Sequence, residues 1–434
     1  MTDLRLQSYE DSLDELDLAG WLDHIAAVHP VRMEMTLDRV RAVAQKMDLL
    51  KPAYRTVIVA GTNGKGTTSV FLEQLLLHAG LSVGTTLSPH VERFNERMRF
   101  GGEDFDDASI CDAFAAVERA RGEIGLTYFE FSTLAALWLF REREVDVGIL
   151  EIGLGGRLDS FNIISADIAV VTSIGLDHEA YLGDNVEAIG REKAGVFRSG
   201  QTVLLGADMP ASVLEQAQTL HCRMLRSGKD FGFVEATDHW TWWMADQRIR
   251  VNHKTRFPLG NCALATAVAA QLVDVSALAL DAAVAGAHLP GRFEVGRLNN
   301  REVIVDVCHN PLGAEYLAAR LGRDYPDTRI IAVCGLLVDK DAAGVFNALR
   351  AVVDVWICLS TSGERARSGA DLASVFAAQS HSSAIEVVED LDDALQKAGS
   401  LAGPSDVILC FGSFTVVERV RPRVIHQQNM SDSA

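Results

Sequence analysis

The sequence predicts an α/β protein of two domains, each built on a mainly parallel sheet, with a small antiparallel β appendage on the first. Three observations predict this fold. Short β-rich runs alternate with amphipathic helical stretches. One stretch, 230–257, has a periodicity of two instead. After a Pro-Gly break near residue 290, a second α/β series begins.

The first domain is predicted over about residues 1–290. Its strands are expected near 56–60, 82–86, 146–151 and 167–173, where apolar and β-branched residues cluster. Helices are expected near 67–79, 107–121, 128–143, 185–191 and 261–273. Within 230–257, aromatic and aliphatic residues alternate with polar ones, which favours antiparallel hairpins: Phe231, Phe233, Trp240, Trp242 and Ile249.

The second domain is predicted over about residues 296–425, after a hinge at 287–293. Its strands are expected at 302–307, 329–334, 354–359, 384–388 and 406–411, enough for an open Rossmann-like sheet. The polar tail at 427–434 is expected to be disordered.

Composition excludes several classes of function. A net charge of −19 argues against nucleic acid as a partner. The acidic N-terminus does not resemble a signal peptide, and no apolar run is long enough to span a bilayer. Seven scattered cysteines without a Cys-x-x-Cys pair indicate reduced core thiols. We therefore expect a cytoplasmic protein without a membrane partner.

A glycine-rich turn between the first strand and its helix predicts phosphate binding. Gly61, Gly64 and Gly66 let the backbone turn tightly and aim N–H groups at an anion, and the helix N-terminus adds its positive end. Lys65 would neutralise phosphate charge, and Thr67 or Thr68 would reach a magnesium ion. A simple glycine turn is the alternative, but the combination with strand and helix favours a nucleotide P-loop.

Polar residues follow several other strands, where open α/β sheets place their ligands. Glu151 ends the strand at 146–151 and is a magnesium candidate. Asp177 and His178 follow the next strand; His178 is interpreted as a site residue, although a capping or surface histidine is the alternative. Ser88-Pro-His90 is a weaker signal, since Ser-Pro often starts a turn. The segment from Asp306 to Pro311 lies in the second domain, which implies a site between the domains.

These motifs occur in the order seen in one known family. The carriers are Gly61–Thr67, Ser88–His90, Arg93–Arg97, Glu151–Asp159, Asp177–His178, Glu192–Gly195, Pro290–Arg292, Asp306–Pro311 and Asp339–Asp341. The chain resembles the folylpolyglutamate synthase/dihydrofolate synthase family of bifunctional bacterial type, in the Mur ligase superfamily, over most of its length. The resemblance implies an ATP-dependent amide ligase of folate biosynthesis that adds L-glutamate to dihydropteroate and to reduced folates through an acyl phosphate.

The resemblance also implies roles for nucleotide and metal residues. Lys65, Lys193 and His309 would be catalytic, and Lys193 matches a lysine that is carbamylated in the superfamily. Ser88, Glu151 and His178 would ligate magnesium, with two Mg²⁺ ions expected and ATP as co-substrate. ATP would bind to Gly61, Thr62, Asn63, Gly64, Lys65, Gly66, Thr67, Asn261, Arg292 and Asp306. An arginine suits phosphate because its planar fork makes paired hydrogen bonds.

Substrate contacts are implied for His90, Arg93, Arg97, Asp159, Asn162 and Lys340, the last as a partner of a glutamate carboxylate. A solvated turn lysine is the alternative for Lys340. Two positions depart from the family pattern. Phe257-Pro258 replaces a His-Gln pair before Asn261, and Phe161 replaces a threonine between Asp159 and Asn162. Adenine contacts and one pterin or phosphate contact are therefore expected to differ.

Three other functions remain open from the sequence. One is a cell-wall UDP-muramoyl amino-acid ligase of the same superfamily. A P-loop kinase or ATPase is another, and a nucleotide-controlled interaction module without turnover is the third. The expected partners are small molecules only, namely dihydropteroate, reduced folates, L-glutamate and ATP, and the chain is expected to be a monomer.

Overall fold

A computed structural model describes residues 16–28, 34–379 and 384–424. The described residues divide into two compact units: those up to Ile174 together with Asn185–His288, and Gly175–Asp184 together with those from Leu289 onward. The predicted α/β fold class is confirmed. The predicted first domain included 175–184, but this short segment groups with the second unit because its contacts are made there. The predicted disorder of 427–434 lies outside the described residues.

The first unit is built on an eight-stranded sheet in the order β4-β3-β2-β5-β1-β6-β7-β8, with β1 in its interior. Strands β2, β5, β1, β6, β7 and β8 run parallel, whereas β3 and β4 add an antiparallel edge. The bounds are β1 Arg55–Ala60, β2 Val83–Thr86, β3 Met98–Phe100, β4 Glu103–Asp104, β5 Val147–Glu151, β6 Ile168–Val171, β7 Thr202–Leu205 and β8 Arg223–Arg226. The carboxyl ends of the parallel strands therefore meet at one edge.

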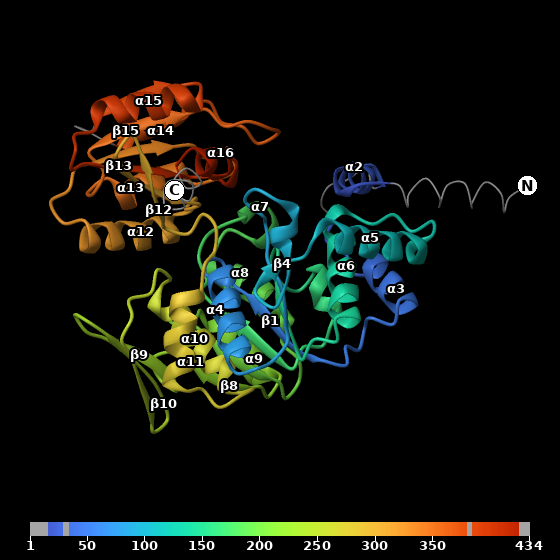
Figure 1. Ribbon diagram of the computed structural model, residues 1–434. Helices are drawn as coiled ribbons and strands as arrows, with labels where there is room; N and C mark the ends of the chain where they lie inside the picture. Colours follow the sequence, from blue (N-terminus) through green and yellow to red (C-terminus); the bar gives the residue numbers. More distant parts are fainter. Residues whose placement is uncertain (1–15, 29–33, 380–383, 425–434) are drawn as a thin grey trace, which may run out of the picture. The chain divides into compact units, whose positions relative to one another are not determined.

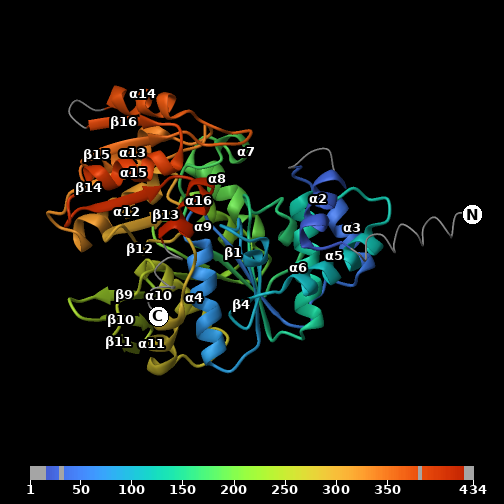
Figure 2. The ribbon, with the colours of Figure 1, turned by 45° about the horizontal axis from the view of Figure 1, so that its top comes forward.

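Helices cover this sheet. Figure 1 and Figure 2 show α4 beside α10 and α11, and the N-terminal α2 and α3 beside α5 and α6. The bounds are α2 Leu18–Val28, α3 Asp38–Lys46, α4 Lys65–His78, α5 Asp107–Arg121, α6 Tyr128–Glu142, α8 Val186–Lys193, α9 Ala211–Thr219, α10 Leu259–Ala269 and α11 Ala277–Gly286. Short 3₁₀ turns are η1 Phe94–Arg97, η2 Ser160–Ile163 and η3 Ala194–Val196.

The predicted β appendage is a three-stranded antiparallel sheet, β9 Phe231–Glu235, β10 Trp240–Met244 and β11 Gln247–Val251. Four of the five residues predicted to alternate are buried, namely Phe231, Trp240, Trp242 and Ile249, whereas Phe233 is exposed. Trp242 Nε1 donates to the Ala263 carbonyl at 3.1 Å, which ties the sheet to α10.

The second unit contains a six-stranded sheet in the order β12-β13-β17-β14-β15-β16. All pairs are parallel except β12–β13, an antiparallel edge pair that the sequence analysis did not predict. The bounds are β12 Glu294–Leu298, β13 Arg301–Asp306, β14 Ile330–Cys334, β15 Val355–Leu359, β16 Ala384–Val388 and β17 Val407–Phe411. The five predicted strands are confirmed to within one residue at each end.

Helices α12 Pro311–Asp324, α13 Ala342–Leu349 and α14 Gly369–Gln379 share one apolar core with this sheet. At its centre Phe346, Trp356 and Phe376 lie with ring centroids 4.8–4.9 Å apart. Helix α15 Leu391–Leu401 packs on β14, and α16 Phe414–Val424 packs on β12, β13 and β17. The short helix α7 Glu179–Leu182 belongs to the segment 175–184. All seven cysteines are free thiols. Cys334, Cys358 and Cys410, in the strands of this sheet, are buried as predicted, whereas Cys111 and Cys222 are only partly buried.

Candidate active site

The glycine-rich turn joins β1 to α4 and has the backbone geometry that its sequence predicts. Gly61 has φ +149° and Gly64 has φ +86°, where an L side chain is strained. A Cβ at Gly61 would lie 1.9 Å from Thr172 Oγ1, and one at Gly64 would lie 2.7 Å from Asn261 Nδ2. Both glycines are therefore required by close approach as well as by backbone conformation. Helix α4 then begins at Lys65, and its first N–H groups have no partner within the helix.

Two lysines meet at one carbonyl of this turn. Lys65 Nζ donates to Gly61 O at 3.1 Å and to Thr62 O at 3.3 Å. Lys193, at the end of α8, is buried, and its Nζ donates to Gly61 O at 2.9 Å. The residues are far apart in sequence, but the fold brings both ammonium groups to the turn. Two cations at one turn would attract an anion of high charge.

Side chains from two other elements hold the turn. Ser173 follows β6 and bonds Asn63 twice, accepting from its N–H at 3.1 Å and donating to its carbonyl at 3.0 Å. Asn261, on α10, donates from Nδ2 to Thr67 Oγ1 at 2.8 Å. Thr67 Oγ1 also donates to Gly64 O at 3.1 Å. The structure thus brings Asn261 to the turn, whereas Ser173 was not among the predicted site residues.

Glu151 and Ser88 lie together at the same sheet edge. The Ser88 N–H donates to Glu151 Oε2 at 2.9 Å, and Glu151 is 4% exposed. Ser88 Oγ is buried and has no hydrogen-bond partner within the described part of the chain. A buried hydroxyl without a partner beside a carboxylate fits a hard divalent cation, which prefers oxygen ligands. His178, the third predicted ligand, belongs to the other compact unit.

The loop after β2 presents a guanidinium between aromatic rings. Arg97 lies 5.8 Å from the Phe94 ring centroid and 5.7 Å from that of Tyr128, within cation–π range. Its Nε donates to His90 Nδ1 at 2.7 Å. Burial and the charge of Arg97 lower the pKa of His90 to about 4, so this imidazole is neutral at pH 7 and carries its hydrogen on Nε2. Tyr128, on α6, was missed because only its aromatic character was visible in the sequence.

The Arg93 side chain lies apart from His90 and Arg97, at the surface. It is 65% exposed and makes a surface ion pair with Asp107 at 3.2 Å. The predicted substrate residues of this loop therefore separate into a buried pair, His90 and Arg97, and an exposed arginine. Exposed pairs of this kind contribute little to stability.

Asp159 and Asn162 are buried and organise the loop after β5. Asp159 accepts N–H hydrogen bonds from Gly153, Leu154 and Phe161 at 2.9–3.1 Å. These bonds and the charge of Lys65 lower the pKa of Asp159, but burial of the carboxyl group has the larger effect. The pKa of Asp159 is therefore raised to about 6.

Asn162 donates to the carbonyls of Arg157 and Gly195 at 2.9 and 3.1 Å, which joins this loop to the segment after Lys193. Phe161 is buried edge-on against Phe129, with centroids 5.9 Å apart.

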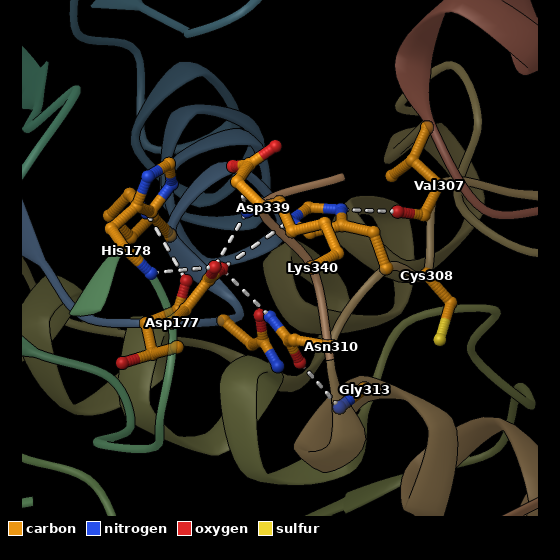
Figure 3. A network of polar contacts seen from close by, with 12 residues as sticks. Asp177, His178, Val307, Cys308, Asn310, Gly313, Asp339 and Lys340 are labelled. Atoms are coloured by element: carbon orange, nitrogen blue, oxygen red, sulfur yellow. Dashed lines mark hydrogen bonds and ion pairs between the residues drawn. The ribbon is translucent and has the colours of Figure 1, made fainter. Parts of the chain in front are cut away.

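In the second unit, one carboxylate collects partners from three segments (Figure 3). Asp177 Oδ1 accepts from Lys340 Nζ at 2.6 Å, and Oδ2 accepts from Asn310 Nδ2 at 3.1 Å. His309 Nε2 lies 3.4 Å from Oδ2, while its Nδ1 lies 2.7 Å from the Val307 carbonyl. Since a carbonyl only accepts, Nδ1 must carry a hydrogen. Both Asp177 and Lys340 are almost fully buried.

Burial opposes ionisation of Asp177, but the hydrogen bond and charge of His309 and the charge of Lys340 outweigh it. They hold the pKa of Asp177 well below its usual range. A role was predicted from the sequence for His178, and none for Asp177 or Asn310. The available signals were the position of Asp177 at a strand end and that of Asn310 before Pro311, where it caps α12 through Gly313.

Arg292 and Asp306 also lie in the second unit. Arg292 lies 5.4 Å from the Phe414 ring centroid, and its Nη1 donates to Gly291 O at 3.2 Å. Asp306 accepts from the N–H groups of Phe293 and Cys308, both at 2.8 Å. Burial raises the pKa of Asp306, opposed by Arg292.

Two kinds of feature are absent from the described residues. No group of three or more His, Cys, Asp or Glu side chains that could hold a metal ion occurs among the described residues. Within those same residues, no helix is long and apolar enough to cross a membrane.

Two protein-family models match this chain. The model for the Mur ligase middle domain matches residues 59–269, and that for the Mur ligase glutamate ligase domain matches residues 291–414. The phosphate turn lies in the first match and the Asp306–Lys340 region in the second. The fold, the turn and these matches define the chain as a Mur ligase, an ATP-dependent ligase.

Within that class, the chain belongs to the dihydrofolate synthase/folylpolyglutamate synthase family, as the sequence predicted. It is 40% identical to the Haemophilus influenzae dihydrofolate synthase/folylpolyglutamate synthase over 92% of this chain and 96% of that protein. The structure of Escherichia coli FolC in complex with DHPP and ADP matches with a TM-score of 0.89 and 38% identity, covering 97% and 99% of the two chains.

A bifunctional folylpolyglutamate synthase/dihydrofolate synthase with Mn, AMPPNP and L-glutamate bound matches with a TM-score of 0.86 and 41% identity, covering 94% and 98%.

Proposed function

We propose that this chain joins L-glutamate to dihydropteroate and to reduced folates with hydrolysis of ATP to ADP and phosphate. The observation that carries this proposal is the phosphate turn, with the ammonium groups of Lys65 and Lys193 both on Gly61 O. The family to which the chain belongs, and the DHPP, ADP and L-glutamate bound by its structural relatives, supply the substrate classes.

The reaction proceeds in two transfers. A substrate carboxylate oxygen attacks the γ-phosphorus of ATP, the bond to the β-γ bridging oxygen breaks, and ADP leaves. The amine of L-glutamate then attacks the acyl carbon, phosphate leaves, and the amine loses a proton. Catalysis consists of holding charged reactants together and neutralising the transferred phosphoryl group.

Residues of the phosphate turn and its neighbours are proposed to bind ATP. The backbone of Gly61–Thr67 cradles the phosphates, and Lys65 neutralises their charge. Asn261 holds Thr67 in place through its carboxamide, which also leaves no room for a Cβ at Gly64. Arg292 would provide a further cation for phosphate, and Asp306 shapes the backbone around it through the Phe293 N–H.

A divalent cation is proposed to bind Ser88, Glu151 and His178, consistent with the Mn ion of a relative. It would supply positive charge at the phosphate oxygens. We propose Mg²⁺ as the ion. Carbamylation of Lys193 would replace its ammonium by a carboxylate-like ligand, and a second Mg²⁺ bound there would then supply the positive charge at the turn. The unpartnered Ser88 hydroxyl beside Glu151 supports the first site.

The cluster around Asp177 is proposed to bind L-glutamate. Lys340 Nζ has three donors and gives one to Asp177, so it can hold a substrate carboxylate with the others. His309 is held between Asp177 and the Val307 carbonyl. It is proposed to be a catalytic residue beside the attacking amine of L-glutamate. Asp177 thereby keeps the side chains of Lys340 and His309 in place.

The pterin-bearing substrate is proposed to bind near His90 and Arg97. Arg97 offers a fixed guanidinium between two rings, and His90 offers a neutral Nε2–H donor. Asp159 and Asn162 support this region through the loop after β5. Arg93 is proposed to make at most an outer contact, because it is exposed.

The test is ADP release by the purified chain with ATP, Mg²⁺ and L-glutamate, adding dihydropteroate, tetrahydrofolate or a UDP-muramoyl acceptor in turn. We expect glutamate-dependent ADP release and an amide product with the two pterin substrates. ADP release with the UDP-muramoyl acceptor alone would establish the cell-wall alternative, and release without amide formation would establish a kinase or ATPase. Turnover with only one pterin substrate would limit the proposal to one activity. A monomeric, cytoplasmic enzyme remains our proposal; light scattering tests the first and cell fractionation the second.

A further inference from the structure

The turn that carries Arg292 has an unusual backbone. Gly291 has φ +67° and Phe293 has φ +49°. Glycine adopts such angles readily, but a bulky residue does so at a cost of order 1–3 kcal/mol. Surrounding contacts must therefore hold Arg292 between two left-handed residues.

Some of those contacts act directly on Phe293. Its N–H donates to Asp306 Oδ2 at 2.8 Å, and the Arg320 guanidinium lies 3.6 Å from its ring centroid. The next contact fixes Gly291, whose carbonyl accepts from the Val307 N–H at 2.9 Å. These bonds explain the position of Phe293 and of the Gly291 carbonyl.

A buried ion pair holds the other side of the turn. Glu294, the first residue of β12, accepts from Arg421 of α16 through two bonds, Nε to Oε2 at 2.6 Å and Nη2 to Oε1 at 3.1 Å. Both side chains are less than 8% exposed. Glu294 Oε2 also accepts the Gly291 N–H at 2.6 Å. The same carboxylate thus joins α16 to the residue before Arg292.

Stability alone does not explain this pair. Removing two charges from water costs about as much as their attraction returns, and a well-packed apolar pair often does as well. The pair instead fixes the geometry of the turn that carries Arg292. Helix α16 reaches the turn twice, through Arg421 and through its first residue Phe414, whose ring lies under Arg292.

We propose that Glu294 and Arg421 are positioning residues for Arg292, acting through the Gly291 N–H. The inference rests on the proposed function, in which Arg292 contributes a cation for ATP phosphate. Without the pair, the turn would lose the acceptor of the Gly291 N–H and Arg292 would no longer be held over Phe414. The expected defect is therefore in nucleotide use, with the fold retained.

The experiment replaces the pair by Glu294→Leu/Arg421→Leu and compares it with Arg292→Ala and with the triple variant. The matched control is Glu118→Leu/Arg121→Leu, which removes another buried ion pair on α5. Readouts are KM for ATP, kcat, binding of a fluorescent ATP analogue and thermal unfolding. Arg292→Ala is expected to raise KM for ATP or lower kcat by about 10–100-fold, and the pair variant should reproduce the same split between KM and kcat.

Non-additivity is the decisive result. If Arg292 acts only when the pair holds its turn, Arg292→Ala should add little to the pair variant, and the control should retain wild-type KM for ATP. Additive effects, or a pair variant with normal ATP kinetics, would overturn the inference, as would an Arg292→Ala variant that behaves like wild type. Failure of the proposed function is distinct, because the wild-type chain would then form no amide. The analogue-binding arm still decides the inference in that case. Should the Leu pair unfold, Arg421→Lys keeps the charge but removes the paired bonds that orient Glu294, and gives the comparison with less change in volume.

Discussion

The phosphate turn of the first unit and the Asp177 cluster of the second hold cations in opposite ways. In the turn, the ammonium groups of Lys65 and Lys193 both donate to the backbone carbonyl of Gly61. In the cluster, Lys340 and His309 share the carboxylate of Asp177. A backbone carbonyl carries no net charge and holds an ammonium group without neutralising it, whereas the carboxylate of Asp177 neutralises charge in part and fixes its direction. The comparison suggests that the turn serves charge neutralisation and the cluster serves orientation.

The largest effect should come from removing charge at the turn. Lys65→Ala should lower kcat by about 10²–10³-fold, because a preorganised cation at the transferred phosphoryl group is lost. The fold should remain, since among the described residues Lys65 donates to two carbonyls of its own loop. Turnover and circular dichroism measure the two parts. Activity close to wild type would remove the P-loop assignment and with it one side of the comparison.

A smaller loss of activity is expected when the Asp177 cluster is changed. Asp177→Asn keeps the shape of the side chain but removes the charge facing Lys340 and His309, which should raise KM for L-glutamate by about tenfold while KM for ATP changes less. Leaving a buried cation without its partner should also cost about 3 kcal/mol of stability. Initial-rate kinetics with each substrate varied, and thermal unfolding, measure these effects.

Asp339→Asn is the matched control for Asp177→Asn, because Asp339 lies 3.9 Å from Lys340 and is more exposed. It should leave KM for L-glutamate nearly unchanged. Equal effects of the two variants would show that the cluster responds to net charge and not to the specific bonds of Asp177.

The pH dependence of stability should have opposite signs at Asp159 of the first unit and at Asp177 of the second. The pKa of Asp177 is depressed, so its stabilisation is present above the unfolded value near 4 and is lost as the pH falls below it. The pKa of Asp159 is raised to about 6, so its protonated form stabilises the fold at low pH, and this contribution is lost as the pH rises from about 4 to about 6. For Asp159 the loss is about 3 kcal/mol.

Thermal midpoints of wild type, Asp159→Asn and Asp177→Asn between pH 3 and pH 7 measure this contrast. The wild type should lose stability relative to Asp159→Asn as the pH rises, and relative to Asp177→Asn as it falls. The same sign for both would mean that the three N–H bonds to Asp159 outweigh its burial.

The smallest effect is expected at Arg93. Arg93→Ala removes an exposed ion pair with Asp107 and should change stability by less than about 1 kcal/mol. Turnover should remain within about twofold, whereas Arg97→Ala, at the buried end of the same loop, should lose considerably more. Steady-state kinetics of the two variants test this. A large loss for Arg93→Ala would return Arg93 to the substrate site.

The sequence alone determined the features that depend on local chemistry. The strand periodicity predicted both parallel sheets and the β appendage, because burial of one or both strand faces leaves a pattern in neighbouring residues. The glycines at 61 and 64 predicted the phosphate turn, because their backbone angles exclude side chains. The order of several short motifs then predicted the family. The edge strand β12 was missed because Glu294 and Arg297 place a charged residue on each of its two faces.

Only the tertiary structure decided which of these residues meet. Asp177 and Lys340 are 163 positions apart, and the grouping of 175–184 with the second unit was not visible in local sequence. Lys193 and Gly61, and Glu294 and Arg421, are likewise joined across long separations. A lysine or glutamate carries the same local signal whether it is solvated or paired. Its partner depends on how distant strands and helices pack, which a single sequence does not encode locally.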